Sequence, residues 1–211
     1  MPMSFCSADD LALLKELSAT VALIPFDGTR FQHYQACGLC SDGSRFHMKG
    51  YFPALCQQNG GGDSMMFEYK TNGTAMCFGL ESPLSPDDIW WRAYLPKFRH
   101  AQDVAGGQIK QFNFVHHWPC RAALDEGISL EHSILLALMS KTRLKRAGVF
   151  PEVAILMWAD TAPGHHELSR VKIDPYIQWM TAHRPGLLPL WQRHDQLLAL
   201  ELPGSKLQAA A

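Results

Sequence analysis

Residues 152–158, with the sequence EVAILMW, place the strongest constraint on the fold of this 211-residue chain. Six of the seven side chains are apolar, and a strand that is apolar on both faces belongs in the centre of a sheet. Residues 129–146, shortly before this run, predict a long amphipathic helix. The apolar side of that helix is formed by Ile134, Leu135, Leu138 and Met139. The chain must therefore contain both a sheet with a buried central strand and at least one long helix.

The N-terminal half predicts a short helix followed by extended segments. Ser7 and Asp10 form a capping-box pattern ahead of several leucines, which indicates a helix start. Residues 20–26 (TVALIPF) are typical of a strand. The dipeptide Asn72-Gly73 stands between two strand-like runs, and it predicts a β-hairpin over residues 65–81.

Proline marks the helices of the later part. Ser85 and Pro86 begin a helix that we expect Pro96 to kink or end. Residues 108–118 (QIKQFNFVHHW) predict a strand. Two last helices are expected from Asp174-Pro175 and from Pro189 onward.

This order of elements predicts an α+β fold with a short N-terminal helix, a β-rich N-terminal half, a mixed middle and a helical C-terminal part. A repeated βαβ rhythm is not visible in the sequence. We expect one domain over residues 1–204, with a small metal-binding insertion at about 33–80 and a disordered tail at 205–211.

The composition is that of a globular protein, with 47% hydrophobic and 18% charged residues and a net charge of −1. This balance argues against a protein coated in positive charge, although local basic patches remain compatible with it. Neither a signal-peptide pattern nor an apolar run long enough to span a membrane is visible. We therefore expect a soluble cytoplasmic protein with reduced cysteines and no membrane partner.

Cysteine and histidine are concentrated in residues 33–56. Zinc prefers four tetrahedral cysteine or histidine ligands, often beginning with a tight C-x₂-C turn, and Cys37 and Cys40 have that spacing. One structural zinc ion is the cofactor that this pattern suggests. Buried reduced thiols and a redox pair are two other interpretations that the sequence leaves open. The candidate zinc ligands are His33, Cys37, Cys40, His47, Cys56 and Cys77.

The segment that contains Cys37, Cys40 and Cys56 resembles the zinc-finger region of the cysteine-bearing subunit in type IV CRISPR effector complexes. The resemblance covers about 40 residues, and the second C-x₂-C pair of that family is missing here. In that family the finger helps to assemble the complex and lies near nucleic acid. The resemblance therefore implies a zinc knuckle, protein partners and proximity to nucleic acid.

Aromatic and basic residues alternate in residues 89–100 (IWWRAYLPKFRH), and a second basic run occupies residues 141–146. Rings that stack on bases and cations that contact phosphates are typical of proteins that bind single-stranded nucleic acid. Helical spacing favours the alternative that Trp90, Tyr94 and Phe98 form a core stripe, and cations at the end of a helix stabilise its dipole without any ligand. The candidate nucleic-acid-binding residues are Trp90, Trp91, Arg92, Lys97, Arg99, Lys141, Arg143, Lys145 and Arg146.

Two further histidine clusters invite a catalytic interpretation. His116, His117 and Cys120 lack the spacing of a cysteine hydrolase, so the sequence favours a structural role for them. Asp160 follows a buried strand, and His165 and His166 could join it at a metal ion, although the HExxH pattern is absent.

A non-catalytic subunit or adaptor that binds partner proteins and nucleic acid is the function that the sequence favours, because no recognised catalytic motif is present. A small metal-dependent hydrolase centred on Asp160, His165 and His166 is the first alternative. A protein–protein inhibitor or scaffold that binds no nucleic acid is the second.

Overall fold

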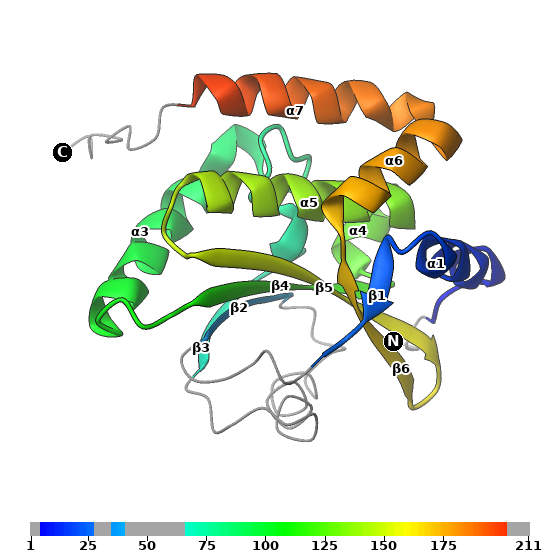
Figure 1. Ribbon diagram of the computed structural model, residues 1–211, viewed down its shortest axis with the longest axis horizontal. Helices are drawn as coiled ribbons and strands as arrows, with labels where there is room; N and C mark the ends of the chain where they lie inside the picture. Colours follow the sequence, from blue (N-terminus) through cyan, green and yellow to red (C-terminus); the bar gives the residue numbers. More distant parts are fainter. Residues whose placement is uncertain (1–4, 28–34, 41–65, 202–211) are drawn as a thin grey trace.

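The computed structural model describes residues 5–27, 35–40 and 66–201, which form a six-stranded sheet with helices packed against it (Figure 1). The order of the strands across the sheet is β1-β6-β5-β4-β2-β3. The strands are β1 (Leu23–Pro25), β2 (Gln35–Cys40), β3 (Met66–Thr71), β4 (Gln111–Trp118), β5 (Glu152–Ala162) and β6 (His165–Val171).

Four neighbouring strands of the sheet are parallel. β2 pairs with both β3 and β4, and β4 pairs with β5, all in the parallel sense. β6 and then β1 extend the sheet in the antiparallel sense. All eight residues of β4 are buried, as expected for a strand inside a parallel sheet.

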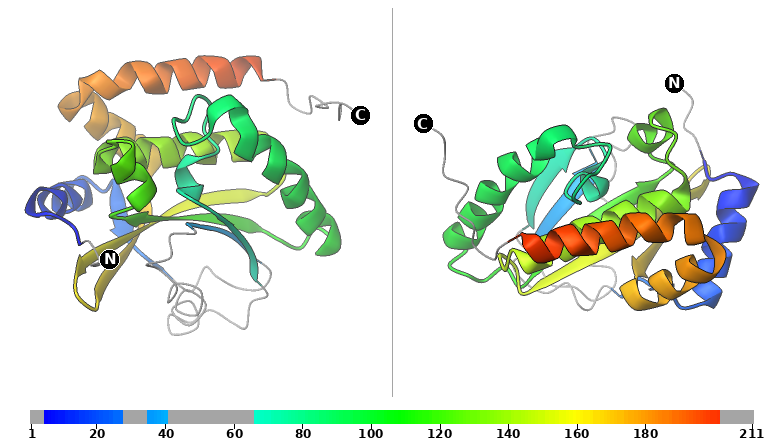
Figure 2. Two further views of the ribbon diagram at one scale, coloured as in Figure 1. Left: turned by 180° about the vertical axis from the view of Figure 1, so that it is seen from behind. Right: turned by 90° about the horizontal axis from the view of Figure 1, so that it is seen from above.

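Six α-helices and three short 3₁₀-helices complete the described part of the chain. The longest, α5, lies over β4 and β5, and α7 lies above α5, whereas α1 lies beside β1 (Figures 1 and 2). The α-helices are α1 (Ala8–Ala19), α3 (Ile89–Val104), α4 (Arg121–Asp125), α5 (Leu130–Arg146), α6 (Ile173–His183) and α7 (Leu188–Leu200). The 3₁₀-helices are η3 (Thr74–Met76), η4 (Pro86–Asp88) and η5 (Pro185–Leu187).

The main core lies between the sheet and these helices. Aromatic rings of β4 pack edge-on against α3, with 4.9 Å between the ring centroids of Phe98 and Phe112. Full burial of one such side chain stabilises the fold by about 1.5–3 kcal/mol. Other fully buried members of this core include Phe78, Phe114, Ile134, Leu138 and Tyr176.

The sequence patterns correctly predicted several elements. Ser7 accepts a hydrogen bond from the backbone of Asp10, whose side chain accepts one from the backbone N–H of Ser7, so the predicted capping box starts α1. Ser129 likewise caps α5. The apolar run 152–158 lies in β5, between β4 and β6. The α+β class is therefore confirmed.

The predicted hairpin over residues 65–81 is not formed. Its first half is β3, but β3 pairs in parallel with β2, and the second half begins with η3. The Thr74 hydroxyl donates to Thr71 O at 2.6 Å and accepts from Thr71 N at 2.9 Å, which stabilises a local turn instead of a strand. Gly73 does adopt the positive φ of 63° that the Asn-Gly pair indicates.

Pro96 neither kinks nor ends its helix in the predicted way, because α3 continues from Ile89 through Pro96 to Val104. The side chain of Pro96 is exposed, so the carbonyl group that loses its helical partner lies on the solvent side. None of the helices formed by the described residues is long and apolar enough to cross a membrane.

Candidate metal centre

Three side chains that could hold a metal ion meet where the parallel strands β2 and β4 end. Cys40 is the last residue of β2, and His117 is the second-last residue of β4. Cys120 immediately precedes α4. Two sulfur atoms and one imidazole nitrogen lie within 4.8 Å of one another. The carboxyl ends of parallel strands are a common position for ligand sites in α/β sheets, because the side chains and loops that follow the strands converge there.

The three side chains are almost completely removed from solvent. Their exposed fractions are 9% for Cys40 and 0% for Cys120, and His117 is 1% exposed. Polar groups that are buried to this extent normally have hydrogen-bond partners, so a buried polar atom without one calls for an explanation.

One ring nitrogen of His117 is engaged by the backbone. Its Nδ1 lies 3.2 Å from the carbonyl oxygen of Pro119. Because a carbonyl oxygen only accepts, Nδ1 carries a proton and donates it, so Nε2 is the ring nitrogen that a metal ion would use. Nε2 is buried and makes no hydrogen bond with any residue that the structure describes. A metal ion bound at Nε2 would give this buried atom a partner.

Cys40 is prepared to act as a thiolate ligand. The backbone N–H of Gly73 donates to Cys40 Sγ at 3.2 Å. A hydrogen bond from the Cys120 thiol lowers the pKa of Cys40 to about 4, and His117 acts in the same direction, against the effect of burial. The same hydrogen bond and burial raise the pKa of Cys120, so this proton stays on Cys120 until a cation displaces it.

Gly73 is required at its position beside Cys40. Its φ of 63° is in the left-handed region, and an added Cβ would lie 2.8 Å from a methyl carbon of Leu84. The glycine therefore allows the backbone to approach the sulfur of Cys40 closely.

Cys77 lies next to the cluster but outside it. Its thiol donates to the carbonyl oxygen of Asn72 at 2.9 Å. Burial and the negative charge of Cys40 raise the pKa of Cys77 to about 12. In this conformation Cys77 is a neutral neighbour of the three-ligand cluster.

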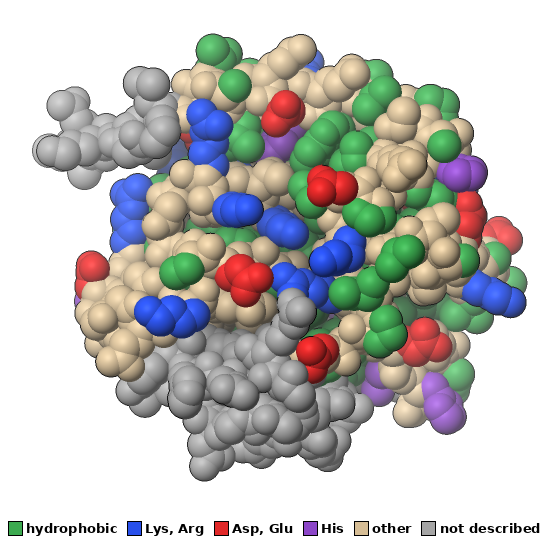
Figure 3. Space-filling view, viewed as in Figure 1, with side chains coloured by type: hydrophobic (Ala, Val, Ile, Leu, Met, Phe, Trp, Pro, Cys, Tyr) green, Lys and Arg blue, Asp and Glu red, His purple; other side chains and the backbone are tan. Residues whose placement is uncertain are grey.

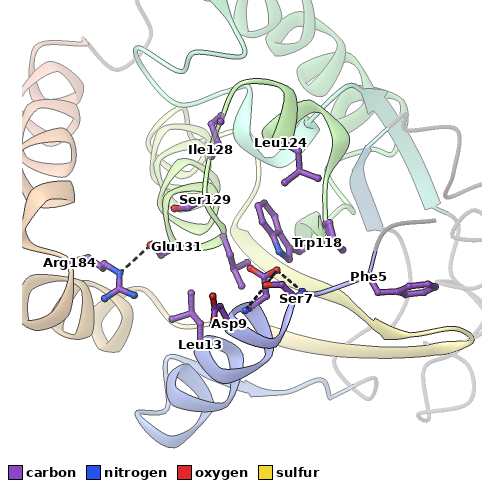
Figure 4. Close-up of a pocket in the computed structure, with 14 residues that line it drawn as sticks. Phe5, Ser7, Asp9, Leu13, Trp118, Leu124, Ile128, Ser129, Glu131 and Arg184 are labelled. Carbon is purple, nitrogen blue, oxygen red and sulfur yellow. Dashed lines mark hydrogen bonds and ion pairs between the residues drawn. The ribbon is translucent and has the colours of Figure 1, made fainter. Parts of the chain in front are cut away.

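A cleft of about 650 Å³ borders the same end of β4. Trp118 and Leu124 line it from one side and Leu13 of α1 from the other (Figure 4). None of the three ligands lines this cleft, although Trp118 and Pro119 lie between His117 and Cys120 in the sequence. The cleft therefore does not open onto the cluster.

The structure keeps only part of the predicted zinc-ligand set together. Cys37 and Cys40 both lie in β2, in place of the expected tight C-x₂-C turn, and a three-residue separation puts their side chains on opposite faces of the sheet. Cys37 packs with Val115 and Trp158, whereas Cys40 belongs to the main core. His33, His47 and Cys56 lie outside the described residues.

Asp160 and His166 form a pair, but His165 does not join them. Asp160 Oδ1 accepts hydrogen bonds from His166 Nδ1 at 2.6 Å and from Trp158 Nε1 at 2.8 Å. Asp160 and His166 are direct partners of the β5–β6 ladder, and His165 is exposed next to the turn that joins these strands. Asp160, His165 and His166 therefore do not form a metal-binding group.

The aromatic-basic run 89–100 contributes mainly to the core. Trp91 is 4% exposed and Phe98 is fully buried, while Trp90 is half-buried and packs against the core. The predicted use of Trp91 as a stacking surface is therefore wrong. Three cations of this run are exposed: Arg92, Lys97 and Arg99.

Arg143 is also not available to a phosphate, contrary to the prediction. It is 2% exposed and forms ion pairs with Asp88 and Glu201, each at 2.5 Å. Lys145 and Arg146 are exposed, and Lys141 is half-buried.

The sequence does not connect His117 and Cys120 with Cys40. Their lack of hydrolase spacing favours a structural role for both, whereas the structure places them beside Cys40. The His-x-x-Cys spacing around Pro119 was the available signal. The partner cysteine is far away in the sequence and is brought close by the pairing of β2 with β4, in which Leu39 faces Val115.

Comparisons with protein-family models, curated proteins and solved structures found no match to this chain, so the interpretation of the cluster depends on its own geometry.

Proposed function

We propose that this protein binds one zinc ion through Cys40, His117 and Cys120, and that the ion fastens β2 to the connection between β4 and α4. The observation that carries the proposal is the convergence of two thiols and one imidazole, all buried, whose ligand atoms lie within 4.8 Å of one another. Each of these groups would be hard to explain alone, and a metal ion explains them together.

The donor set favours zinc over other common cations. Thiolate and imidazole ligands suit a borderline-soft metal, whereas calcium and magnesium take oxygen ligands. With metal–ligand distances of about 2.0–2.3 Å, tetrahedral zinc needs ligand atoms about 3.5–3.8 Å apart. Small side-chain rotations would bring ligand atoms that already lie within 4.8 Å to this separation.

Burial of the ligands favours a structural ion over a catalytic one. A catalytic zinc keeps a position open to water and substrate. Here all three ligands are at least nine-tenths buried, and the neighbouring cleft is lined by other residues. Cys77 is a candidate fourth ligand, because its thiol is close enough to Cys40 for the negative charge of Cys40 to raise its pKa. This arrangement is compatible with a non-catalytic adaptor whose fold the metal supports.

Metal analysis of the purified protein tests the proposal directly. We expect about one zinc per chain by mass spectrometry of the dialysed protein, and loss of that zinc in Cys40→Ser and Cys120→Ser. Cys37→Ser is the matched control, because it removes a buried thiol from the same strand on the opposite face. Equal zinc contents in the Cys37→Ser and Cys40→Ser variants would contradict the proposed ligand set.

Cobalt substitution distinguishes the coordination number. Tetrahedral cobalt with two thiolates should give intense charge-transfer and d–d absorption, and Cys77→Ser should shift these bands only if Cys77 is the fourth ligand. Absence of any charge-transfer band in the cobalt-loaded wild-type protein would rule out thiolate coordination.

A further inference from the structure

A group of cations lies near the amino-terminal ends of the parallel strands, whereas the candidate metal centre lies at their carboxyl ends. α5 runs from the carboxyl end of β4 back to the amino-terminal end of β5. Its last two turns therefore lie near the amino-terminal ends of the parallel strands. The antiparallel strand β6 also ends there. Lys141 and Lys145 lie in this part of α5, and Arg170 and Lys172 lie at the end of β6. We name these four residues the α5–β6 patch.

Figure 3 shows lysine and arginine side chains gathered over this part of the molecule. Arg170 of the patch forms an ion pair with Glu152 at 3.2 Å, and Asp27 lines the same small pocket as Arg170. Lys141 is half-buried among the others, and burial together with the charges of Arg170, Lys145 and Lys172 lowers its pKa to about 8. This gathering of four cations contrasts with the net charge of −1 for the whole chain.

Spacing makes the patch suitable for a repeating anion. Lys141 and Lys145 are four residues apart on one helix face, which is about 6 Å along the axis. Arg170 and Lys172 are two residues apart at the end of a strand, which is about 7 Å. The two pairs of cations thus have similar spacings of about 6 and 7 Å. Such regular spacing suits the successive phosphate groups of a nucleic-acid backbone better than it suits a single carboxylate.

We propose that the α5–β6 patch binds the phosphate backbone of nucleic acid without sequence preference. The exposed side chains of Lys145 and Lys172 make the outer contacts, and Lys141 adds positive charge beneath them. The patch contains no aromatic side chain, so contacts to phosphate, which carry no sequence information, dominate. This role differs from the one predicted for Trp91 and Arg143, which are buried.

Fluorescence polarisation with labelled 20-nucleotide single-stranded DNA, single-stranded RNA and duplex DNA tests the proposal. Four phosphate contacts imply that affinity falls on the order of 100-fold between 50 and 200 mM salt. The double variant Lys145→Glu with Lys172→Glu should weaken binding at low salt at least tenfold and reduce the salt slope by about half.

The matched control is Lys15→Glu with Arg121→Glu, which makes the same change in net charge at two exposed positions on α1 and α4. This control should bind within about twofold of the wild-type protein. Equal losses in both double variants would overturn the patch as the site, because the effect would then depend on total charge alone. Thermal melts of all proteins establish that the variants are folded.

A separate arm uses vesicles that contain phosphatidylserine. Binding to the vesicles with no binding to any oligonucleotide would overturn the assignment to nucleic acid. Cys40→Ser, if folded, should retain binding to oligonucleotides, because the α5–β6 patch and the metal centre lie at opposite edges of the parallel strands.

Discussion

The guanidinium carbon of Arg143 lies 4.3 Å from the centroid of the Trp91 ring and joins α5 to α3 inside the protein. The same guanidinium group is held by Asp88, which precedes α3, and by Glu201, which follows α7. It also donates to the carbonyl oxygen of Phe78 at 3.3 Å. One buried cation thus connects α5 with residues 78–91 and with Glu201 at the end of α7.

Arg143→Met should lower the free energy of unfolding by about 3 kcal/mol, because two carboxylates lose their buried partner. Both carboxylates keep some contact with solvent, so the loss falls at the lower end of the range for broken buried pairs. Urea denaturation measures the change. Arg146→Ala, at an exposed position one helical turn away, should alter the stability by no more than about 0.5 kcal/mol. A similar effect of both substitutions would contradict the central role of Arg143.

Stability should decrease as the pH falls from about 6.5 toward 4, in part through His194. Burial, with a contribution from Arg143, lowers the pKa of His194 to about 4, while nearby Asp195 has the opposite effect. The unfolded chain therefore binds a proton in this range that the folded chain does not bind, and stability is complete only above the unfolded pKa.

Replacement of this side chain isolates its contribution. His194→Gln retains a group that can bond to Thr142, whose hydroxyl lies 2.9 Å from His194 Nε2. The slope of unfolding free energy against pH should then fall by up to one proton between pH 4 and 6.5. A residual slope is expected from His116, whose pKa burial lowers to about 3. An unchanged slope in the variant would show that His194 is protonated in the folded state.

Asp160→Asn should destabilise the protein without changing its zinc content. The Asp160 carboxylate accepts hydrogen bonds from Trp158 and His166, and the weaker amide acceptor should lower the free energy of unfolding by about 1–3 kcal/mol. Urea denaturation and metal analysis of the same preparation measure both quantities. Loss of zinc with unchanged stability would instead support the metal-dependent hydrolase centred on this residue.

Pro96→Ala should increase the free energy of unfolding by about 1–3 kcal/mol. Pro96 is exposed inside a continuous helix, where alanine restores an N–H donor and removes the clash of the ring with the preceding turn. Arg99→Ala, at another exposed position of α3, serves as a control for general effects of alanine in this helix. Destabilisation by Pro96→Ala would show that the proline contributes a contact that outweighs its helix propensity.

Chelation of zinc should lower the midpoint of thermal unfolding by about 10 °C, since an ion held far above its dissociation constant contributes several kcal/mol. Differential scanning calorimetry with and without a chelator measures this shift. The shift should disappear in Cys120→Ser, which has no site to empty. Equal shifts in both proteins would locate the metal elsewhere.

Local sequence signals were sufficient for those elements whose causes are themselves local. Ser7 and Ser129 cap their helices in the predicted way, because a cap depends on residues three positions away. Asn72-Gly73 predicted the correct backbone conformation at Gly73 but the wrong structure after it, since hydrogen bonds of the Thr74 side chain decide the path of the chain.

The candidate metal centre could be predicted only in part, for a physical reason. Spacing in the sequence grouped Cys40 with Cys37, yet the two-residue period of a strand separates them. Cys40 meets His117 only because β2 pairs in parallel with β4, and parallel pairing requires a long connection that leaves no local signal. The resemblance to a zinc-finger subunit depends on the same C-x₂-C spacing. It therefore also treats Cys37 and Cys40 as neighbouring ligands, although they lie on opposite faces of β2.

The pairing of Leu23 with Val171 has a consequence for the order of folding. β1 is made early in synthesis, but among the described strands it pairs only with β6, which leaves the ribosome about 150 residues later. Until then the outer strand must stay unpaired, and closing so distant a contact is slow. A chain truncated before β6 would therefore lack the strand with which β1 pairs. We infer that β1 joins the sheet late in folding, although it is the first strand in the sequence.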